Sequence, residues 1–312
     1  MATKKATKPA AKKTSTKPAP RKAATTTKVT TVKAKSSATH SVAAGAGRVS
    51  GFKVDNTTLN IVIAELVGTF ILVMVAMLTL QSVMPLYLGL AVALLVMSVG
   101  AVSGAHVNPA VTFGLWSARR LKSVLLPFYW GAQFLGAMAA VVVTNLVSSN
   151  SLSLDFSHFG AFNWGIFFIE LIGAAVFLFG LTAITKRADL TDGTKAVGVG
   201  LSFFVGILVA SSLFASLQSG IDSSKVGVEV DKTTGQQKLT NVPHELRITG
   251  ATLNPAIALA STEQTDSQLQ SGTVSKDEKQ YSRLSWETLL STLIGAALGA
   301  NLASLMGRRF KS

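Results

Sequence analysis

The chain contains no cysteine, and this absence excludes disulfide bonds, thiol catalysis and cysteine-ligated metal sites. Charged residues are scarce, at 14% of the 312 residues, whereas 48% are hydrophobic. The four histidines, His40, His106, His158 and His244, lie far apart in the sequence, which argues against a histidine metal site. The HExxH, P-loop and GxGxxG motifs are absent as well. We therefore expect neither an enzyme nor a protein that holds a metal ion or cofactor.

Acidic residues are missing from residues 1–53, which hold 13 Lys and Arg and supply 13 of the 14 excess positive charges of the chain. This segment is rich in Lys, Ala, Thr, Ser and Pro, so it cannot bury enough apolar surface to fold. We predict a disordered, cytoplasmic, Lys-rich tail over residues 1–57. Its charge favours a weak contact with anionic lipid or another polyanion. A targeting peptide is the less favoured alternative, because transit peptides prefer Arg to Lys.

Long uncharged tracts dominate the rest of the chain, and six of them reach the length needed to span a membrane. They lie at about residues 59–80, 84–102, 124–147, 162–185, 194–215 and 286–306. This pattern predicts an all-α membrane protein with six transmembrane helices.

A short segment occurs twice, as SGAHVNPA at residues 103–110 and as TGATLNPA at residues 249–256. Each copy leads into an apolar run of about ten residues, which is too short to cross a hydrocarbon core of about 30 Å alone. Asn is a natural helix cap and Pro suits the first helical position, so each copy predicts the start of a re-entrant half-helix. Matched interruptions of this kind mark the binding site or pore of transporter folds.

The two halves of the apolar region repeat beyond these octets. AELVG at residues 64–68 corresponds to IELIG at 169–173, and Gly-Leu at 89–90 corresponds to Gly-Leu at 200–201. Because each half contains three spans, the second half is inverted relative to the first. The predicted channel domain at 58–307 consists of repeat one at 58–150 and repeat two at 160–307, with outer insertions at about 217–247 and 261–285, and is followed by a short basic end at 308–312.

Basic residues indicate the orientation, because cytoplasmic loops carry an excess of Lys and Arg. With both termini inside, the inner segments hold 22 of the 29 Lys and Arg, and the outer segments hold the other 7, mixed with acids. We therefore expect a multi-pass protein of the cell membrane with both termini in the cytoplasm and both insertions outside.

The polar side chains expected to contact a permeant molecule in the two octets are Asn108 and Asn254. If the half-helices meet, two amide donors face one spot, with the positive ends of two helix dipoles behind them. A water or hydroxyl oxygen can accept from both donors, while the positive field repels cations and protons. Gly104 and Gly250 are expected to provide left-handed or close backbone geometry. A secondary transporter is disfavoured, since no acidic pair for ion coupling lies near the octets.

These features resemble the aquaporin (major intrinsic protein) family. The resemblance covers about residues 58–307 and rests on both octets, AELVGTF at 64–70, QFLGA at 133–137, Glu170 and IGAALG at 294–299. It implies the aquaporin-like fold, a pore in each subunit and usually a homotetramer. The pore motifs would be Asn108, Pro109 and Ala110 with Asn254, Pro255 and Ala256, and the loop-bracing residues would be Glu65, Glu170 and His106.

The expected pore departs from the family at its outer constriction. Most water channels that resemble this chain have Arg directly after the second Asn-Pro-Ala, and here that position is Ile257. The other expected constriction residues are Leu88, Ile207 and Ala251, so the constriction has no charge and no side-chain donor. Such a pore either accepts larger uncharged solutes or closes by dewetting. Arg247, in the flanking insertion, is a candidate to fold back and restore the charge.

The predicted function is a passive channel for water and small uncharged solutes, with these molecules and the lipid bilayer as its partners. Two alternatives stay open. One is a facilitator for glycerol, ammonia or urea, and the other is a structural membrane protein with a closed pore.

Overall fold

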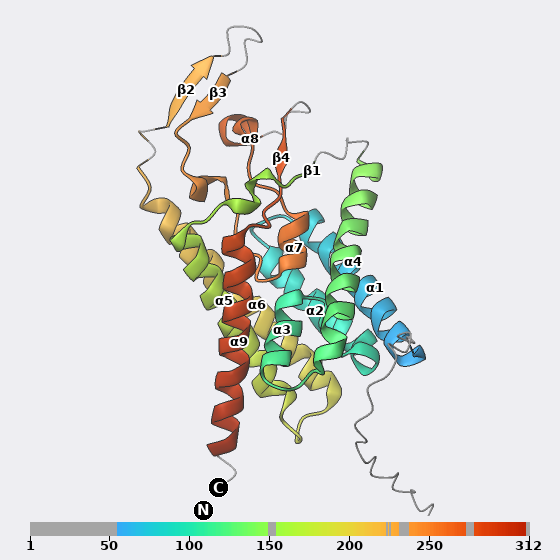
Figure 1. The fold of residues 1–312 in the computed structure, drawn as a ribbon. Helices are drawn as coiled ribbons and strands as arrows, with labels where there is room; N and C mark the ends of the chain where they lie inside the picture. The colour runs from blue at the N-terminus through green and yellow to red at the C-terminus, as the bar shows by residue number, and fades with distance from the viewer. Residues whose placement is uncertain are drawn as a thin grey trace, which may run out of the picture. The chain divides into compact units, whose positions relative to one another are not determined.

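The computed structural model describes residues 55–148, 154–222, 224, 226–230, 237–272 and 278–309. Six long helices dominate this part of the chain (Figure 1). They are α1 (Asn56–Leu78), α2 (Met84–Ser103), α4 (Leu126–Val147), α5 (Trp164–Thr185), α6 (Asp192–Ser219) and α9 (Trp286–Arg309). All six are long and apolar enough to cross a membrane, so the predicted six-span fold is confirmed.

Large apolar side chains are exposed along these helices. On α1 the exposed residues Ile63, Val67 and Ile71 recur every four positions, which places them on one face. Gly68 and Leu72, on the other face, are buried. A soluble monomer rarely exposes an apolar stripe of this length, so the surface fits a lipid environment.

The spans pack as two groups of three that correspond to the two halves of the repeat. In the first group α1 packs against α4, and in the second α5 packs against α9. Each pair meets at a glycine, because a Cβ on Gly136 would overlap the carbonyl oxygen of Leu66 and one on Gly295 would overlap that of Leu171. Leu66 and Leu171 occupy corresponding positions of the repeated sequence, so the repeat extends to the packing.

Helices α2 and α6 join the two groups. Gly89 of α2 lies against the backbone of Gly200 of α6, and neither position has room for a Cβ. The two Gly-Leu pairs of the repeated sequence therefore lie at the contact between the repeats.

The two half-helices are α3 (Pro109–Ser117) and α7 (Pro255–Ala260), and α7 lies above α3 between the long helices in Figure 1. Each packs mainly against the third span of the opposite repeat, α3 against α9 and α7 against α4. The expectation of about ten residues is wrong for α7, which has six. It ends at Ala260 because Ser261 turns to an extended backbone, and the Ser282 hydroxyl then donates to the carbonyl of Leu259 in the last turn (2.9 Å).

In the described ranges, the shorter elements are two strand pairs, one small helix and three 3₁₀ turns. They are η1 (Ser123–Leu125), β1 (Leu154–Asp155), η2 (Ser157–Gly160), β2 (Gly227–Val230), β3 (Gln237–Thr240), η4 (His244–Arg247), α8 (Asp266–Ser271) and β4 (Gln280–Tyr281). β1 pairs in parallel with β4, and β2 pairs antiparallel with β3. These strands are an addition to the predicted all-α architecture.

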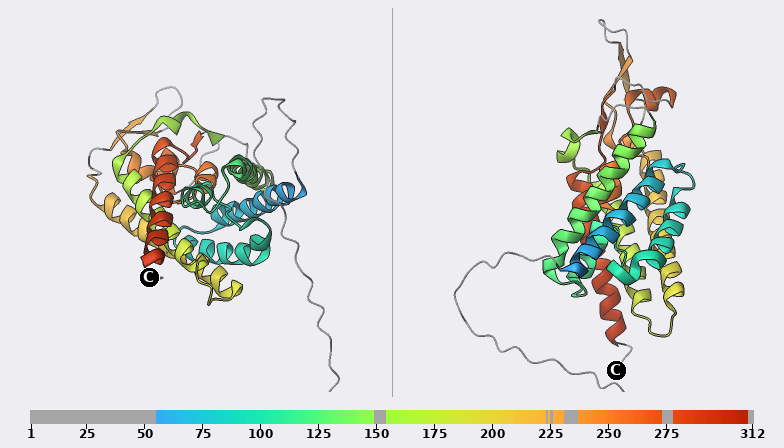
Figure 2. Two further views of the ribbon diagram at one scale, coloured as in Figure 1. Left: turned by 60° about the horizontal axis from the view of Figure 1, so that its bottom comes forward. Right: turned by 90° about the vertical axis from the view of Figure 1, so that its right-hand side faces the viewer.

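The strands and α8 lie beyond one end of the spans, which we call the insertion side (Figures 1 and 2). The opposite end, where α1 begins and α9 ends, is called the terminal side. Helix α6 continues to Ser219, into the first residues of the predicted insertion at 217–247, because its apolar pattern persists to Leu217.

Most of the predicted tail at residues 1–57 lies outside the described residues. Helix α1 begins at Asn56, within the predicted tail, because the Asp55 carboxylate caps it by accepting from the backbone N–H of Thr58 (2.8 Å). Of the predicted basic end at 308–312, Arg308 and Arg309 complete α9, and the remaining residues lie outside the described part of the chain.

Candidate pore

The octet asparagines cap the two half-helices. The Oδ1 atom of Asn108 accepts from the backbone N–H of Ala110 (2.8 Å), and that of Asn254 accepts from Ala256 (2.9 Å). The following residue is proline in both helices, and its missing N–H would have had no partner in the first turn. The short sequence Asn-Pro-Ala thus contains both the start signal and the cap.

The amide nitrogens of the same two asparagines cross to the opposite loop. Asn108 Nδ2 donates to the carbonyl of Leu253 (3.0 Å), and Asn254 Nδ2 donates to the carbonyl of Val107 (3.1 Å). Both asparagine side chains are buried. The structure therefore brings the two octets together, with the starts of the half-helices facing each other.

The residue before each asparagine has an unusual backbone. Val107 and Leu253 adopt positive φ angles of 44° and 50°. Gly104 is left-handed as predicted, at φ 85°, but the prediction for Gly250 is wrong. Gly250 has neither a positive φ nor a close neighbour, because Gly104 is the left-handed cap that ends α2, whereas Gly250 caps no helix.

Glu65 is a buried acceptor for the first loop. It accepts from the backbone N–H groups of His106 (2.9 Å) and Val107 (2.7 Å). The side chains of Ser103 (2.6 Å) and Gln133 (2.8 Å) also donate to it. Four donors therefore converge on one carboxylate at the expected loop-bracing position.

Glu170 has the corresponding place beside the second loop. It accepts from the backbone N–H of Thr252 (3.0 Å), the Thr252 hydroxyl (3.2 Å) and the N–H of Leu253 (2.9 Å). Instead of a glutamine, its fourth neighbour is the guanidinium of Arg283, whose Nη2 lies 3.5 Å from Oε1. The two loops thus share a carboxylate but differ in the group that accompanies it.

A small cavity of about 10 Å³ lies beside Asn108. Its polar walls are Asn108 and His106, and its apolar walls include Leu72, Phe177 and Phe203. The volume corresponds to about one position for a water molecule. The ring of His106 stacks on Tyr129, with centroids 4.5 Å apart, so it is both packed and close to this cavity.

The four residues expected at the outer constriction are all buried. Leu88, Ile207, Ala251 and Ile257 belong to one continuous apolar cluster, and none is more than 1% exposed. Arg247 does not return to them. Its guanidinium pairs with Asp266 of α8 (2.6 Å), which lies beyond the end of the spans in Figure 1, so the expectation that Arg247 restores the missing charge at the constriction is wrong.

A different arginine, Arg283, is buried three residues before α9 begins. Arg283 is 3% exposed and donates from Nη1 to the hydroxyl of Thr288 (2.9 Å). The same nitrogen lies 3.5 Å from Glu287, while Nη2 lies 3.5 Å from Glu170. This guanidinium therefore connects the start of α9 to the carboxylate that holds the second loop.

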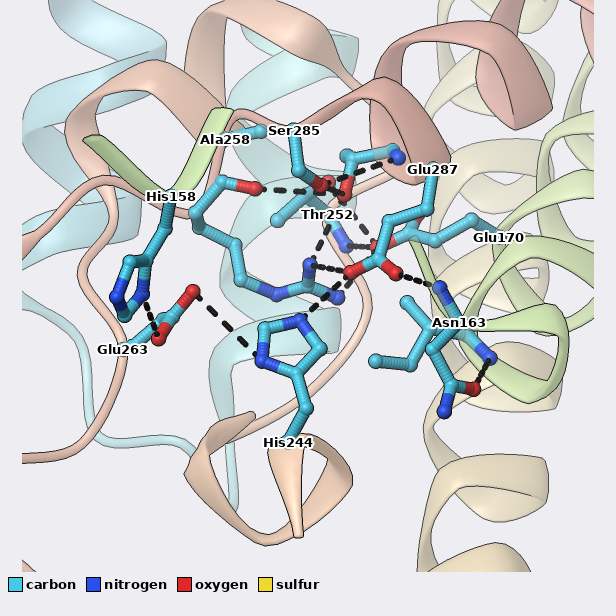
Figure 3. A network of polar contacts seen from close by, with 12 residues as sticks. His158, Asn163, Glu170, His244, Thr252, Ala258, Glu263, Ser285 and Glu287 are labelled. Atoms are coloured by element: carbon cyan, nitrogen blue, oxygen red, sulfur yellow. Dashed lines mark hydrogen bonds and ion pairs between the residues drawn. The ribbon is translucent and has the colours of Figure 1, made fainter. Parts of the chain in front are cut away.

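Two histidines extend this polar network (Figure 3). His244 Nε2 lies 2.9 Å from Glu287, and His158 Nδ1 lies 3.0 Å from Glu263. His244 also approaches Glu263, at 3.9 Å, so two histidines that are distant in the sequence meet at one buried carboxylate. Within the described residues, no group of three His, Cys, Asp or Glu side chains could hold a metal ion.

The sequence alone did not identify Arg283 as a site residue. One available signal was its spacing of four residues from Glu287, which suits an ion pair on one helical turn. A second was Glu287 itself, an acid at the start of a predicted span. No sequence signal connects either residue to Glu170, which lies in another span.

Comparisons with known proteins agree with this architecture. The family model described as major intrinsic protein matches residues 53–219, more than half of the chain. Aquaporin NIP2-2 of Zea mays is 34% identical over 133 residues, covering 42% of this chain and 43% of that protein. Aquaporin-1 of Mus musculus is 32% identical over 158 residues, covering 49% and 55%. The chain thus spans about half the length of these relatives.

The fold is also similar to a solved structure, the aquaglyceroporin from Plasmodium falciparum. The TM-score is 0.50 at 20% sequence identity, over 80% of this chain and 99% of that one. Six spans in an inverted repeat, with two facing half-helices, define the class as a multi-pass membrane protein. The chain belongs to the major intrinsic protein family. Members of this family are channels rather than enzymes.

Proposed function

We propose that the protein is a passive transmembrane channel for water and for small uncharged solutes. The observation that carries this proposal is the pair of crossing hydrogen bonds made by Asn108 and Asn254. An amide NH₂ group has two hydrogens, and each crossing bond uses one of them. We assign the second hydrogen of each amide to an oxygen atom of the permeant molecule.

Electrostatics at this point favours neutral permeants over cations. Each half-helix begins next to its capping asparagine and carries about half a positive charge at that end. An oxygen acceptor is attracted to such a place, whereas a cation or proton is repelled.

The dimensions beside Asn108 support water as the main permeant. The cavity there has the volume of about one water position, and most of its wall is apolar. We assign Leu88, Ile207, Ala251 and Ile257 to the outer constriction, where they give a larger solute no hydrogen bond in return for its lost hydration. Glycerol and urea therefore rank behind water as permeants.

We further propose that the terminal side faces the cytoplasm. The two described loops on that side, together with the first turn of α6, carry six basic residues, an excess of the kind found in cytoplasmic loops. They are Arg119, Arg120, Lys122, Lys186, Arg187 and Lys195. By analogy with the family, we also propose a channel domain at 58–307 and a homotetramer in the cell membrane. We propose that the tail is accessory to the channel.

Purified full-length protein in liposomes tests the proposed function. After an osmotic step in a stopped-flow instrument, we expect these vesicles to shrink faster than empty ones. Parallel assays with glycerol, urea and ammonia then rank the permeants. Asn254→Ala should slow water flux because it removes a pore donor, whereas Asn145→Ala, which changes an amide bonded within α4, should not. Shrinkage equal to that of empty vesicles would contradict the proposal and favour the closed-pore alternative.

A further inference from the structure

Arg283 is held beside the second half-helix by its backbone as well as its side chain. Its N–H donates to the carbonyl of Ser261 (2.9 Å), at the end of α7. Its guanidinium forms an ion pair with Glu170. This carboxylate accepts from the backbone N–H of Thr252, in the loop before the same short helix. The side chain therefore extends along α7, from the end of the helix toward the loop that precedes it.

The aromatic neighbour of the guanidinium places it relative to the expected constriction. The Arg283 Cζ atom lies 5.8 Å from the centroid of the Phe214 ring, on α6. Phe214 follows Ile207 by seven residues, which is two helical turns, so both side chains are on the same face of α6. At 1.5 Å per residue, the backbone of Phe214 is about 10 Å farther along α6 than that of Ile207, so the guanidinium beside Phe214 lies on the insertion side of Ile207.

Two nitrogens of the guanidinium lack a hydrogen-bond acceptor in the part of the chain that the structure describes. Nε and Nη2 are buried and have no hydrogen-bond partner within the described residues, although Nη2 forms the ion pair with Glu170. A buried donor without a partner is costly, and arginine cannot lose its charge to relieve that cost. Water or another neutral oxygen acceptor is the ligand that fits two such buried nitrogens.

We propose that Arg283 is the charge-selectivity residue of this channel. Its guanidinium, from the segment that follows α7, supplies the positive charge that is missing at Ile257. This charge repels protons and metal cations at the end of the pore on the insertion side. Glu170 and Glu287 hold the guanidinium in place, and Phe214 covers one of its faces. This inference rests on the proposed channel function, which it deepens by naming the residue that excludes cations.

Proton and water permeability measured on the same proteoliposomes test the assignment. Proton entry is followed with a trapped pH-sensitive dye under an imposed membrane potential, and water flux is followed by light scattering. Arg283→Met should raise the ratio of proton to water permeability by roughly tenfold or more, because it removes a nearby unit charge. Arg283→Lys, which keeps the charge, should raise it less. Arg247→Met is the matched control, since it removes an arginine that pairs with Asp266 instead.

The possible outcomes separate this inference from the proposed function. Wild-type protein that conducts no water contradicts the proposed function itself. Water conduction with an equally low proton leak in wild type and Arg283→Met overturns the selectivity role alone. If Arg283→Met does not accumulate in membranes, the charge-matched Arg283→Met/Glu287→Gln variant replaces it and should show the same leak. If both fail to insert while Arg247→Met inserts normally, Arg283 serves assembly, and the assignment is overturned.

Discussion

Val107 and Leu253 are strained residues that orient the two asparagines. Their left-handed backbone is unfavourable for a residue with a Cβ, and most of all for β-branched Val. Such a conformation costs roughly 1–3 kcal/mol per residue. Buried carboxylates bind both N–H groups, and both carbonyls turn toward the asparagine of the opposite loop. The strain is thus part of the geometry that aims the amide groups.

The constriction assignment predicts the effect of Ile257→Arg. The new guanidinium would fill apolar space and add donors, so glycerol and urea permeability should fall relative to water by roughly tenfold. Ile257→Val keeps the site apolar and serves as the control. The ratio of solute to water flux in liposomes is the measurement. An unchanged ratio in a folded Ile257→Arg protein would mean that the constriction is formed elsewhere.

Residues within short motifs were accessible from the sequence, whereas those joined over long distances were not. Asn108 and Asn254 can be recognised from the sequence because the capping residue, the proline that follows it and the repeated segment all lie within eight consecutive residues. The contact between Arg283 and Glu170 depends on how an insertion folds back across α7. The prediction for Gly250 failed because glycine permits a left-handed backbone but does not require one.

The helices of this fold approach each other at positions that tolerate only glycine. Gly295 of α9 illustrates this, because a Cβ there would overlap the backbone of Leu171 on α5. Gly307, on the same helix, has no neighbour within 4 Å of the position of a Cβ. Comparing Gly→Ala at these two sites therefore separates the effect of close helix packing on stability from the effect of helix propensity.

We expect Gly295→Ala to destabilise the protein by about 1–3 kcal/mol through overpacking. Gly307→Ala should be neutral or stabilising, since Ala favours a helix over Gly by roughly 1 kcal/mol. Thermal unfolding of both variants in detergent, followed by circular dichroism, measures the difference. Equal melting temperatures for the two variants would argue against close contact between α5 and α9.

The long helices were predictable because membrane spans are fixed mainly by length and hydropathy. The strands and α8 were not, because two to six polar residues contain too little periodicity to indicate a strand or a helix. β1 and β4 show this most clearly. They have two residues each, and their pairing joins segments on either side of α5, α6 and α7.

At the scale of the whole chain, the basic tail and the channel are predicted to be separable. Deleting residues 1–53 should leave osmotic water permeability per channel unchanged, because the two octets and the spans lie outside this segment. Binding to anionic vesicles should weaken, since each Lys or Arg near such a surface contributes about 1 kcal/mol. Stopped-flow assays at matched protein incorporation, and vesicle flotation, measure the two effects. Loss of water flux on deletion would contradict an accessory role.

Each half-helix packs mainly against a span of the opposite repeat, and this arrangement has a consequence for biosynthesis. α3 emerges from the ribosome early, but the helix against which it mainly packs, α9, is translated last. Until then α3 lacks its main packing partner, although Glu65 of the first repeat can already bind the loop before it. The first repeat therefore cannot complete its packing on its own. We expect both half-helices to reach their final packing only after α9 is made, so a shortened chain should leave the pore incomplete.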